Sequence, residues 1–151
     1  MIYNRTQKDV DDAIRLISEK VKTFQELTTQ DIETLERGTL TINTLNRIEE
    51  KTQELSELLN NIGYWHSPFV AKHWEFGQIF HLEDFERILN NLKILRDSFL
   101  VYKDTPEVPY ANYTRYQTIN DVEKLLHDLE RLIPDVISHY RECGTFECGE
   151  V

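Results

Sequence analysis

The histidines and cysteines are the residues of this chain whose spacing could bind a metal or support catalysis. His66 and His73 lie close to Glu75, and His139 precedes the two cysteines near the end of the sequence. A zinc site usually needs four ligands, with a tight pair of cysteines and a second pair elsewhere, and neither group supplies such a set. The sequence also contains no His-Glu-x-x-His element, no phosphate-binding glycine loop and no Gly-x-Ser-x-Gly element. We therefore expect no metal, no cofactor and no enzymatic activity.

Aromatic side chains are stronger candidates, because they gather in one segment that carries little charge. The segment from Tyr64 to Phe80 contains both tryptophans and shows no helical period, so we predict an ordered aromatic loop. Such segments are typical of the centres of protein interfaces and equally typical of the lid of a small helical core, and both alternatives stay open. The candidate partner-binding residues are Tyr64, Trp65, Phe69, Trp74, Phe76 and, near the end of the chain, Phe146.

Helices are the elements that must position these residues, and the first one carries a narrow apolar stripe. Thr6 and Asp9 form an N-terminal capping pair, so we predict a heptad helix over about residues 6–27. Such a stripe can pack on the protein's own bundle or on the same helix of another subunit. Its residues, at alternating spacings of four and three, are Val10, Ile14, Ile17, Val21 and Phe24.

The remaining helices form the predicted bundle, over about residues 29–140. A short helix from about residue 29 should end at Gly38, because glycine favours the conformation that follows a helix. Three longer helices are predicted over about residues 41–62, 82–100 and 119–140, and Pro134 should kink the last of them. The fold is therefore predicted to be all-α. It is a small bundle of about four long helices and one short helix, with the aromatic loop and a short extended C-terminal tail over about residues 141–151. Residues 1–151 are assigned to a single helical domain.

Three of these helices open with the same pattern: an apolar residue, any residue, a basic residue and an apolar residue. The copies are 45–48, 85–88 and, more weakly, 122–125, with Arg47, Arg87 and Lys124 as the basic residues. The pattern is either a likeness that amphipathic helices share or the trace of a duplicated helical hairpin. In the second case, each basic head should lie at the edge of the core and pair with a neighbouring carboxylate.

The charge balance excludes several classes of partner. The chain has 17 Lys and Arg residues against 27 Asp and Glu residues, which gives a net charge of −10 and an isoelectric point near 4.9. Nucleic-acid and anionic-membrane binding both depend on basic side chains, so we expect neither partner. No apolar run reaches the roughly 18 residues of a membrane span, and the first residues resemble no secretion signal. We expect a soluble protein that is not exported.

Four short elements, in order along the chain, carry a family resemblance. The first reads Thr-Leu-Asn-Arg-Ile-Glu at 44–49 and the second runs from Trp74 to Ile88. The third reads Asn-Asp-Val-Glu-Lys-Leu-Leu at 120–126 and the fourth Gly-Thr-Phe-Glu-Cys-Gly-Glu at 144–150. Together they resemble small helical proteins encoded in the tail and baseplate regions of phages and prophages of Gram-positive bacteria. The resemblance covers about residues 38–150 and departs from the family pattern at Gln78, where an acidic residue is usual.

The resemblance implies a phage or prophage virion structural protein, in the tail, baseplate or fibre-attachment apparatus, that acts through protein–protein contacts. Its expected partners are other virion or tail proteins. We expect several copies or a homo-oligomer, located in the virion after assembly in the host cytoplasm. The alternative is an acidic cytoplasmic regulatory or inhibitor module that binds a basic partner. Binding through aromatic anchors should survive added salt, whereas binding through charge should not.

Overall fold

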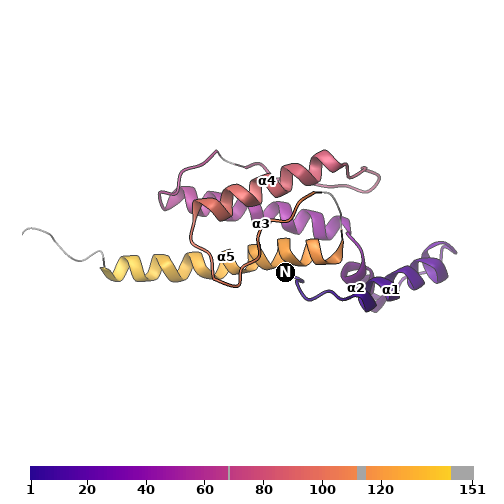
Figure 1. The fold of residues 1–151 in the computed structure, drawn as a ribbon. Helices are drawn as coiled ribbons and strands as arrows, with labels where there is room; N and C mark the ends of the chain where they lie inside the picture. The colour runs from indigo at the N-terminus through magenta and orange to yellow at the C-terminus, as the bar shows by residue number, and fades with distance from the viewer. Residues whose placement is uncertain (68, 112–114, 144–151) are drawn as a thin grey trace, which may run out of the picture.

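The structure is a computed structural model that describes residues 1–67, 69–111 and 115–143. Over these ranges the chain forms helices and no strands, which confirms the all-α prediction (Figure 1). The elements are α1 (Gln7–Leu16), the π-helix η1 (Ile17–Val21), α2 (Thr29–Gly38), α3 (Ile42–Asn61), α4 (Leu82–Ser98) and α5 (Tyr116–Cys143).

The core lies between α3, α4 and α5, each of which packs against the other two (Figure 1). An apolar residue recurs every three or four positions in all three helices, so each presents one apolar face to the others. Burying one aliphatic side chain of this size contributes about 1.5–3 kcal/mol. The fully buried aliphatic residues include Leu55, Leu59, Leu92, Leu95, Leu125, Leu126, Leu129 and Ile133.

The last helix is longer than predicted at both ends. It begins at Tyr116 and continues to Cys143, and it passes through Pro134 as one helix without a restart. Because no glycine or proline lies between residues 135 and 143, nothing local stops the helix before Gly144. Residues 141–143 are therefore helical, which corrects the predicted start of the extended tail. Phe146 and the rest of that predicted tail lie outside the described residues.

A helical hairpin formed by α1, η1 and α2 lies at one end of the bundle (Figure 1). The prediction of one regular helix over residues 6–27 was wrong, because the α-helical geometry ends at Leu16 and a π-turn follows. None of the stripe residues belongs to the core of the bundle, which was one of the two alternatives for the stripe. Ala13 and Leu16 are the buried side chains of α1, whereas Ile14 is 56% exposed. The hairpin closes through small residues, and most of the apolar stripe stays at the surface.

Two ion pairs join the helices of the hairpin. Arg37 Nε donates to Asp9 Oδ1 at 2.9 Å, and Lys20 Nζ donates to Asp31 Oδ2 at 2.6 Å. The hydrogen bonds from Arg37 and Thr6 lower the pKa of Asp9 to about 2. The hydrogen bond from Lys20 is the main reason that the pKa of Asp31 is also lowered to about 2. Both carboxylates therefore stay ionised and paired throughout the neutral range.

Gly38 ends α2 as predicted, but the reason for a glycine at this position differs from the predicted one. It is the last residue of α2, and its φ is not positive, so it does not end the helix through a left-handed turn. A Cβ at this position would overlap the carbonyl oxygen of Asp9 and the Cβ of Ala13. The absence of a side chain thus allows α2 to approach the backbone of α1.

Replacing Gly38 by alanine is expected to open the hairpin and leave the bundle folded. The new methyl group meets backbone atoms, which cannot move aside, and overpacking of this kind costs about 1–3 kcal/mol. Amide hydrogen exchange should accelerate about tenfold or more in α1 and α2 and stay unchanged in α3 to α5. Gly77→Ala is a control for the location of the effect: its added methyl group meets no atom within 4 Å, and its φ of 91° confines the strain to the loop between α3 and α4, so exchange in α1 and α2 should stay unchanged. Unchanged exchange in the hairpin of Gly38→Ala would contradict the close approach.

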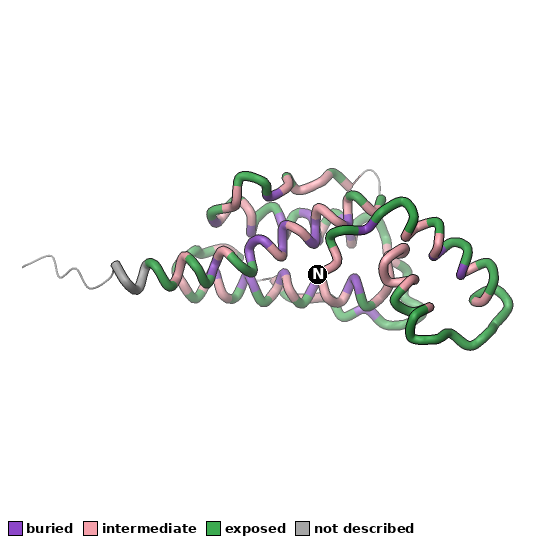
Figure 2. Tube along the Cα trace, turned by 90° about the horizontal axis from the view of Figure 1, so that it is seen from below, coloured by how far each residue is buried: buried purple, intermediate pink, exposed green. Residues whose placement is uncertain are grey.

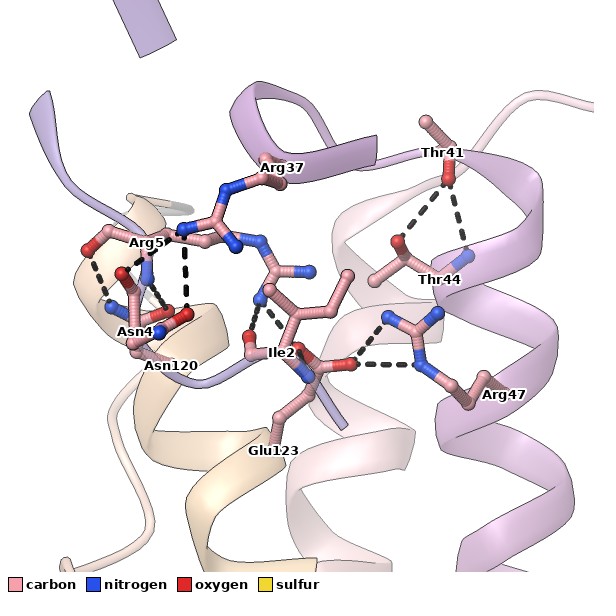
Figure 3. Close-up of polar contacts among 9 residues, drawn as sticks. All are labelled: Ile2, Asn4, Arg5, Arg37, Thr41, Thr44, Arg47, Asn120 and Glu123. Carbon is pink, nitrogen blue, oxygen red and sulfur yellow. Dashed lines mark hydrogen bonds and ion pairs between the residues drawn. The ribbon is translucent and has the colours of Figure 1, made fainter. Parts of the chain in front are cut away.

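The segment before α1 is tied to the bundle through a buried carboxylate (Figure 3). Glu123 accepts hydrogen bonds from the Ile2 backbone N–H at 3.0 Å, from Arg47 Nε at 3.0 Å and from the Arg5 guanidinium. Asn120 accepts from the Arg5 backbone N–H at 3.1 Å and donates to the Arg5 carbonyl at 2.9 Å. One buried negative charge thus connects the N-terminal segment, α3 and α5.

The basic residue of each repeated pattern pairs with a carboxylate, as the repeat predicted. The first two pairs join neighbouring helices, α3 to α5 and α4 to α3, and the third lies within α5. Both arginine side chains are about one third exposed, so their heads lie at the edge of the core. The pairs are Arg47–Glu123, Arg87–Glu49 and Lys124–Asp128.

Candidate partner-binding surface

The predicted aromatic loop is the segment that joins α3 to α4, and we call residues 64–80 the aromatic segment (Figure 1). It contains no helix or strand over its described residues, so side chains of α3 hold its backbone in place. Asn46 accepts from the Trp74 N–H at 2.7 Å and donates to the Trp74 carbonyl at 3.1 Å. Gln53 accepts from the Ala71 N–H at 2.7 Å. The segment is therefore ordered by specific hydrogen bonds to a rigid helix.

Trp74 anchors the aromatic segment in the core. Its side chain is 2% exposed, and its indole Nε1 donates to Glu49 Oε1 at 3.3 Å. The ring of Phe80 packs edge-on against it with centroids 5.3 Å apart, and Lys72 Nζ lies 3.8 Å from the indole centroid. Trp74 was a candidate partner-binding residue, but it does not reach the surface. Its part is to hold the segment.

Glu49 links this anchor to α4. The carboxylate is buried and binds the guanidinium of Arg87 as well as the indole of Trp74. The hydrogen bond that Arg87 donates to Glu49 is the main reason that the pKa of Arg87 lies above its ordinary value. A buried carboxylate with both a cation and a neutral donor is well compensated for its lost hydration. Glu49 therefore fixes α3, α4 and the aromatic segment relative to one another.

The start of the aromatic segment is held by a second set of contacts. The ring of Tyr64 packs edge-on against Phe99 with centroids 4.8 Å apart. His66 Nε2 lies 2.8 Å from Ser56 Oγ, and its Nδ1 lies 3.0 Å from the Tyr64 carbonyl oxygen. The ring of Phe69 packs against that of His66 with centroids 5.1 Å apart and is partly buried. Tyr64 and Phe69 thus contribute more to the support of the segment than to its surface.

The remaining aromatic candidates are exposed. Trp65 is 83% exposed and Phe76 is 97% exposed, although Asn60 binds the backbone N–H of His66 beside Trp65 and Asn46 binds that of Trp74, two residues before Phe76. Val70 and Ile79 are also largely exposed, and the sequence analysis did not single them out. Their apolar character in a segment without helical period was the signal that could have found them. The inner side chains of the segment cover the core, as the lid alternative predicted, and its outer ones face solvent.

The described part of the chain contains neither a metal-binding cluster nor a helix fit to span a membrane. No three His, Cys, Asp or Glu side chains within it lie close enough together to hold a metal ion. None of its helices combines the length and the apolar character that a membrane crossing requires. Comparisons of the whole chain with family models, with curated proteins and with solved structures found no match.

Proposed function

We propose that this chain is a non-enzymatic helical adaptor that binds a protein partner through Trp65 and Phe76 of the aromatic segment. The observation that supports it is the contrast within one segment, where Asn46 and Trp74 fix the backbone while two large aromatic rings stay in solvent. A tryptophan or phenylalanine side chain can bury about 150–250 Å² in a contact. Since the loop is already ordered, a partner that covers these rings loses little conformational entropy of the segment.

The family resemblance supplies the setting of this proposal. In that setting the partner is another virion or tail protein, and the chain is present in several copies in the tail, baseplate or fibre-attachment apparatus of a phage or prophage. We propose four longer helices for the adaptor, with η1 counted as part of the first, one short helix and, outside the described residues, the predicted C-terminal tail. Phe146 in that tail would give a second contact.

The test compares phage particles that are assembled with wild-type chain and with the double variant Trp65→Ala/Phe76→Ala. Each exposed anchor should contribute about 2 kcal/mol or more to binding, so the double variant should bind roughly 1,000-fold more weakly and be absent from purified particles. Its free energy of unfolding should change by less than about 1 kcal/mol, because both rings are exposed in the free chain. Quantitative immunoblotting of gradient-purified particles measures the incorporation.

Tyr110→Ala is the matched control, because Tyr110 is an equally exposed aromatic residue outside the aromatic segment. This variant should enter particles like the wild type. Incorporation of the double variant at the wild-type level would overturn the assignment of the anchors. Absence of the wild-type chain from particles would overturn the virion setting.

The acidic-module alternative is separated by the salt dependence of binding. Its supporting observation is the net charge of −10. Ionic contacts at a protein surface are largely screened as the Debye length falls from about 10 Å at 0.1 M salt to about 3 Å at 1 M. A complex that persists at about 1 M salt and is lost when Trp65 is replaced supports the adaptor proposal. A complex that dissociates at about 1 M salt and is unaffected by the replacement of Trp65 supports the acidic-module alternative.

A further inference from the structure

The N-terminal hairpin buries too little of its own surface to account for its order. Ala13 and Leu16 are its only buried apolar side chains, and neither η1 nor α2 contributes a buried residue, although every residue from 7 to 38 is described. Helices of about ten residues are marginal in water unless an amphipathic face packs against something. Figure 2 shows exposed residues following one another around the turn of the hairpin. The hairpin therefore exposes apolar surface whose burial in a contact would stabilise it.

The apolar residues of the hairpin lie on one side of the seam between its helices. Arg15, Glu19, Gln30 and Thr34 line a polar groove along the other side. At about 100° per residue, the α1 positions on the opposite side of the seam include Ile14, and Val21 continues them in η1. The same geometry places Ile32 on that side of α2. Together with Phe24 and Leu27, which lie in the segment that joins η1 to α2, these residues form the surface that we call the hairpin face, and its exposed members are Ile14, Val21, Phe24, Leu27 and Ile32.

Phe24 is the residue of the hairpin face that most requires an explanation. It is 96% exposed, and its φ of 56° lies in the left-handed region. Its N–H donates to the Val21 carbonyl at 3.1 Å and the next N–H donates to the Lys20 carbonyl at 3.0 Å, so it occupies a helix-ending position that glycine normally takes. A non-glycine residue there costs about 1 kcal/mol or more. A strained residue that holds an aromatic ring in solvent indicates a contact made by that ring.

We propose that the hairpin face is covered by the same face of a second copy of this chain, which forms a two-fold symmetric dimer. The five exposed side chains present on the order of 500 Å² of apolar surface. A standard interface buries about 800 Å² on each partner, of which somewhat more than half is apolar. The hairpin face therefore supplies the apolar area that one half of such an interface needs.

The charge around the hairpin face fits a second copy of the same chain. Two chains that each carry a charge of −10 repel one another, so they can associate only where the contact surface is nearly neutral. All five exposed members of the hairpin face are uncharged, so the face itself meets this condition.

The dimer is tested by analytical ultracentrifugation of the full-length chain over a concentration range from about 1 μM to 1 mM, which spans Kd values typical of modest interfaces. The wild type should change from monomer to dimer within this range. Added salt should strengthen the dimer, because it screens the repulsion between the two acidic chains. A wild-type chain that stays monomeric at the highest concentration overturns the proposal.

Two variants of the same hairpin locate the interface. Ile14→Glu places a charge in the hairpin face and should weaken dimerisation at least 100-fold. Gln30→Glu adds the same charge on the polar side of the seam and should leave the dimer within about threefold of the wild type, since it lies away from the contact. Equal dimerisation of wild type and Ile14→Glu would place the interface elsewhere and overturn the proposal.

Phe24→Gly separates a binding role from a structural one. Glycine relieves the left-handed strain, so the midpoint of thermal unfolding of the monomer, measured at low concentration, should stay equal or rise. The loss of the ring should weaken the dimer at least tenfold. A variant that loses dimerisation without losing stability supports the proposal, and one that dimerises like the wild type contradicts it. This test does not rest on the proposed function of the aromatic segment.

Discussion

Replacing Glu123 by glutamine is expected to lower the free energy of unfolding by about 3–5 kcal/mol, a large share of the 5–15 kcal/mol that a domain of this size has. The Glu123 side chain is 0% exposed and that of Arg5 is 2% exposed, so the guanidinium would remain buried without a counter-charge. Two nitrogens of Arg5 already have no hydrogen-bond partner among the described residues, and glutamine cannot restore the lost charge. Urea unfolding followed by circular dichroism measures the loss.

Glu130→Gln provides the matched control for this substitution. Glu130 also lies on α5 and also pairs with a cation, Lys51 Nζ at 2.8 Å, but its side chain is 43% exposed. Exposed pairs contribute about 0–1 kcal/mol, so this variant should unfold at nearly the same urea concentration as the wild type. The double variant Arg5→Met/Glu123→Met should recover most of the stability lost by Glu123→Gln, because it removes both buried charges. Equal effects of the two single glutamine variants would show that the buried network contributes no more than a surface pair.

The three-helix core could be predicted from the sequence because aliphatic spacing determines it directly. Residues such as Ile48, Leu55 and Leu92 repeat at helical intervals, and each faces the core of the structure. The packing of the hairpin could not be predicted in this way. It depends on Ala13 and on Gly38, whose small size allows two helices to approach but which carry little weight in a hydrophobic pattern. Ile14, Val21 and Phe24 of the predicted stripe are exposed, and a sequence pattern cannot show what covers exposed apolar side chains.

The polar residues of the first resemblance element all hold the fold. Asn46 binds the backbone of Trp74, Arg47 binds Glu123 on α5, and Glu49 binds Arg87 on α4. These partners lie between 28 and 76 residues away in the sequence, so no local pattern could have paired them. The element that carries the resemblance thus specifies the arrangement of helices and of the aromatic segment. It is a structural signature, and the function must be sought in the side chains that this arrangement leaves exposed.

The two tryptophans show why the sequence could not divide the aromatic segment between core and surface. Trp65 and Trp74 lie nine positions apart in a stretch without helical or strand period, so no periodicity predicts which of them points inward. The difference comes from α3, where Asn46 and Glu49 are placed to bind the backbone and the indole of Trp74. No described side chain of α3 hydrogen-bonds the indole of Trp65 in the same way.

The same substitution is therefore expected to destabilise the protein strongly at one of these two positions and hardly at all at the other. Trp74→Ala should lower the free energy of unfolding by about 3–5 kcal/mol, because it leaves a large cavity and removes a donor from the buried Glu49. Trp65→Ala should change it by less than about 0.5 kcal/mol, because the side chain is 83% exposed. Urea unfolding measures both values.

The fluorescence of the remaining tryptophan in each variant tests the placement independently of stability. In Trp65→Ala the only tryptophan is the buried Trp74, so emission should be blue-shifted and resistant to quenching by iodide. Trp74→Phe keeps an aromatic ring in the core and leaves only Trp65, whose emission should be red-shifted and quenched almost as in the unfolded chain. Similar emission and similar stability losses in the two variants would contradict the division of the segment into an anchored and an exposed part. Trp65 and Phe76 could then no longer be treated as preformed anchors, since their exposure depends on Trp74 staying in the core.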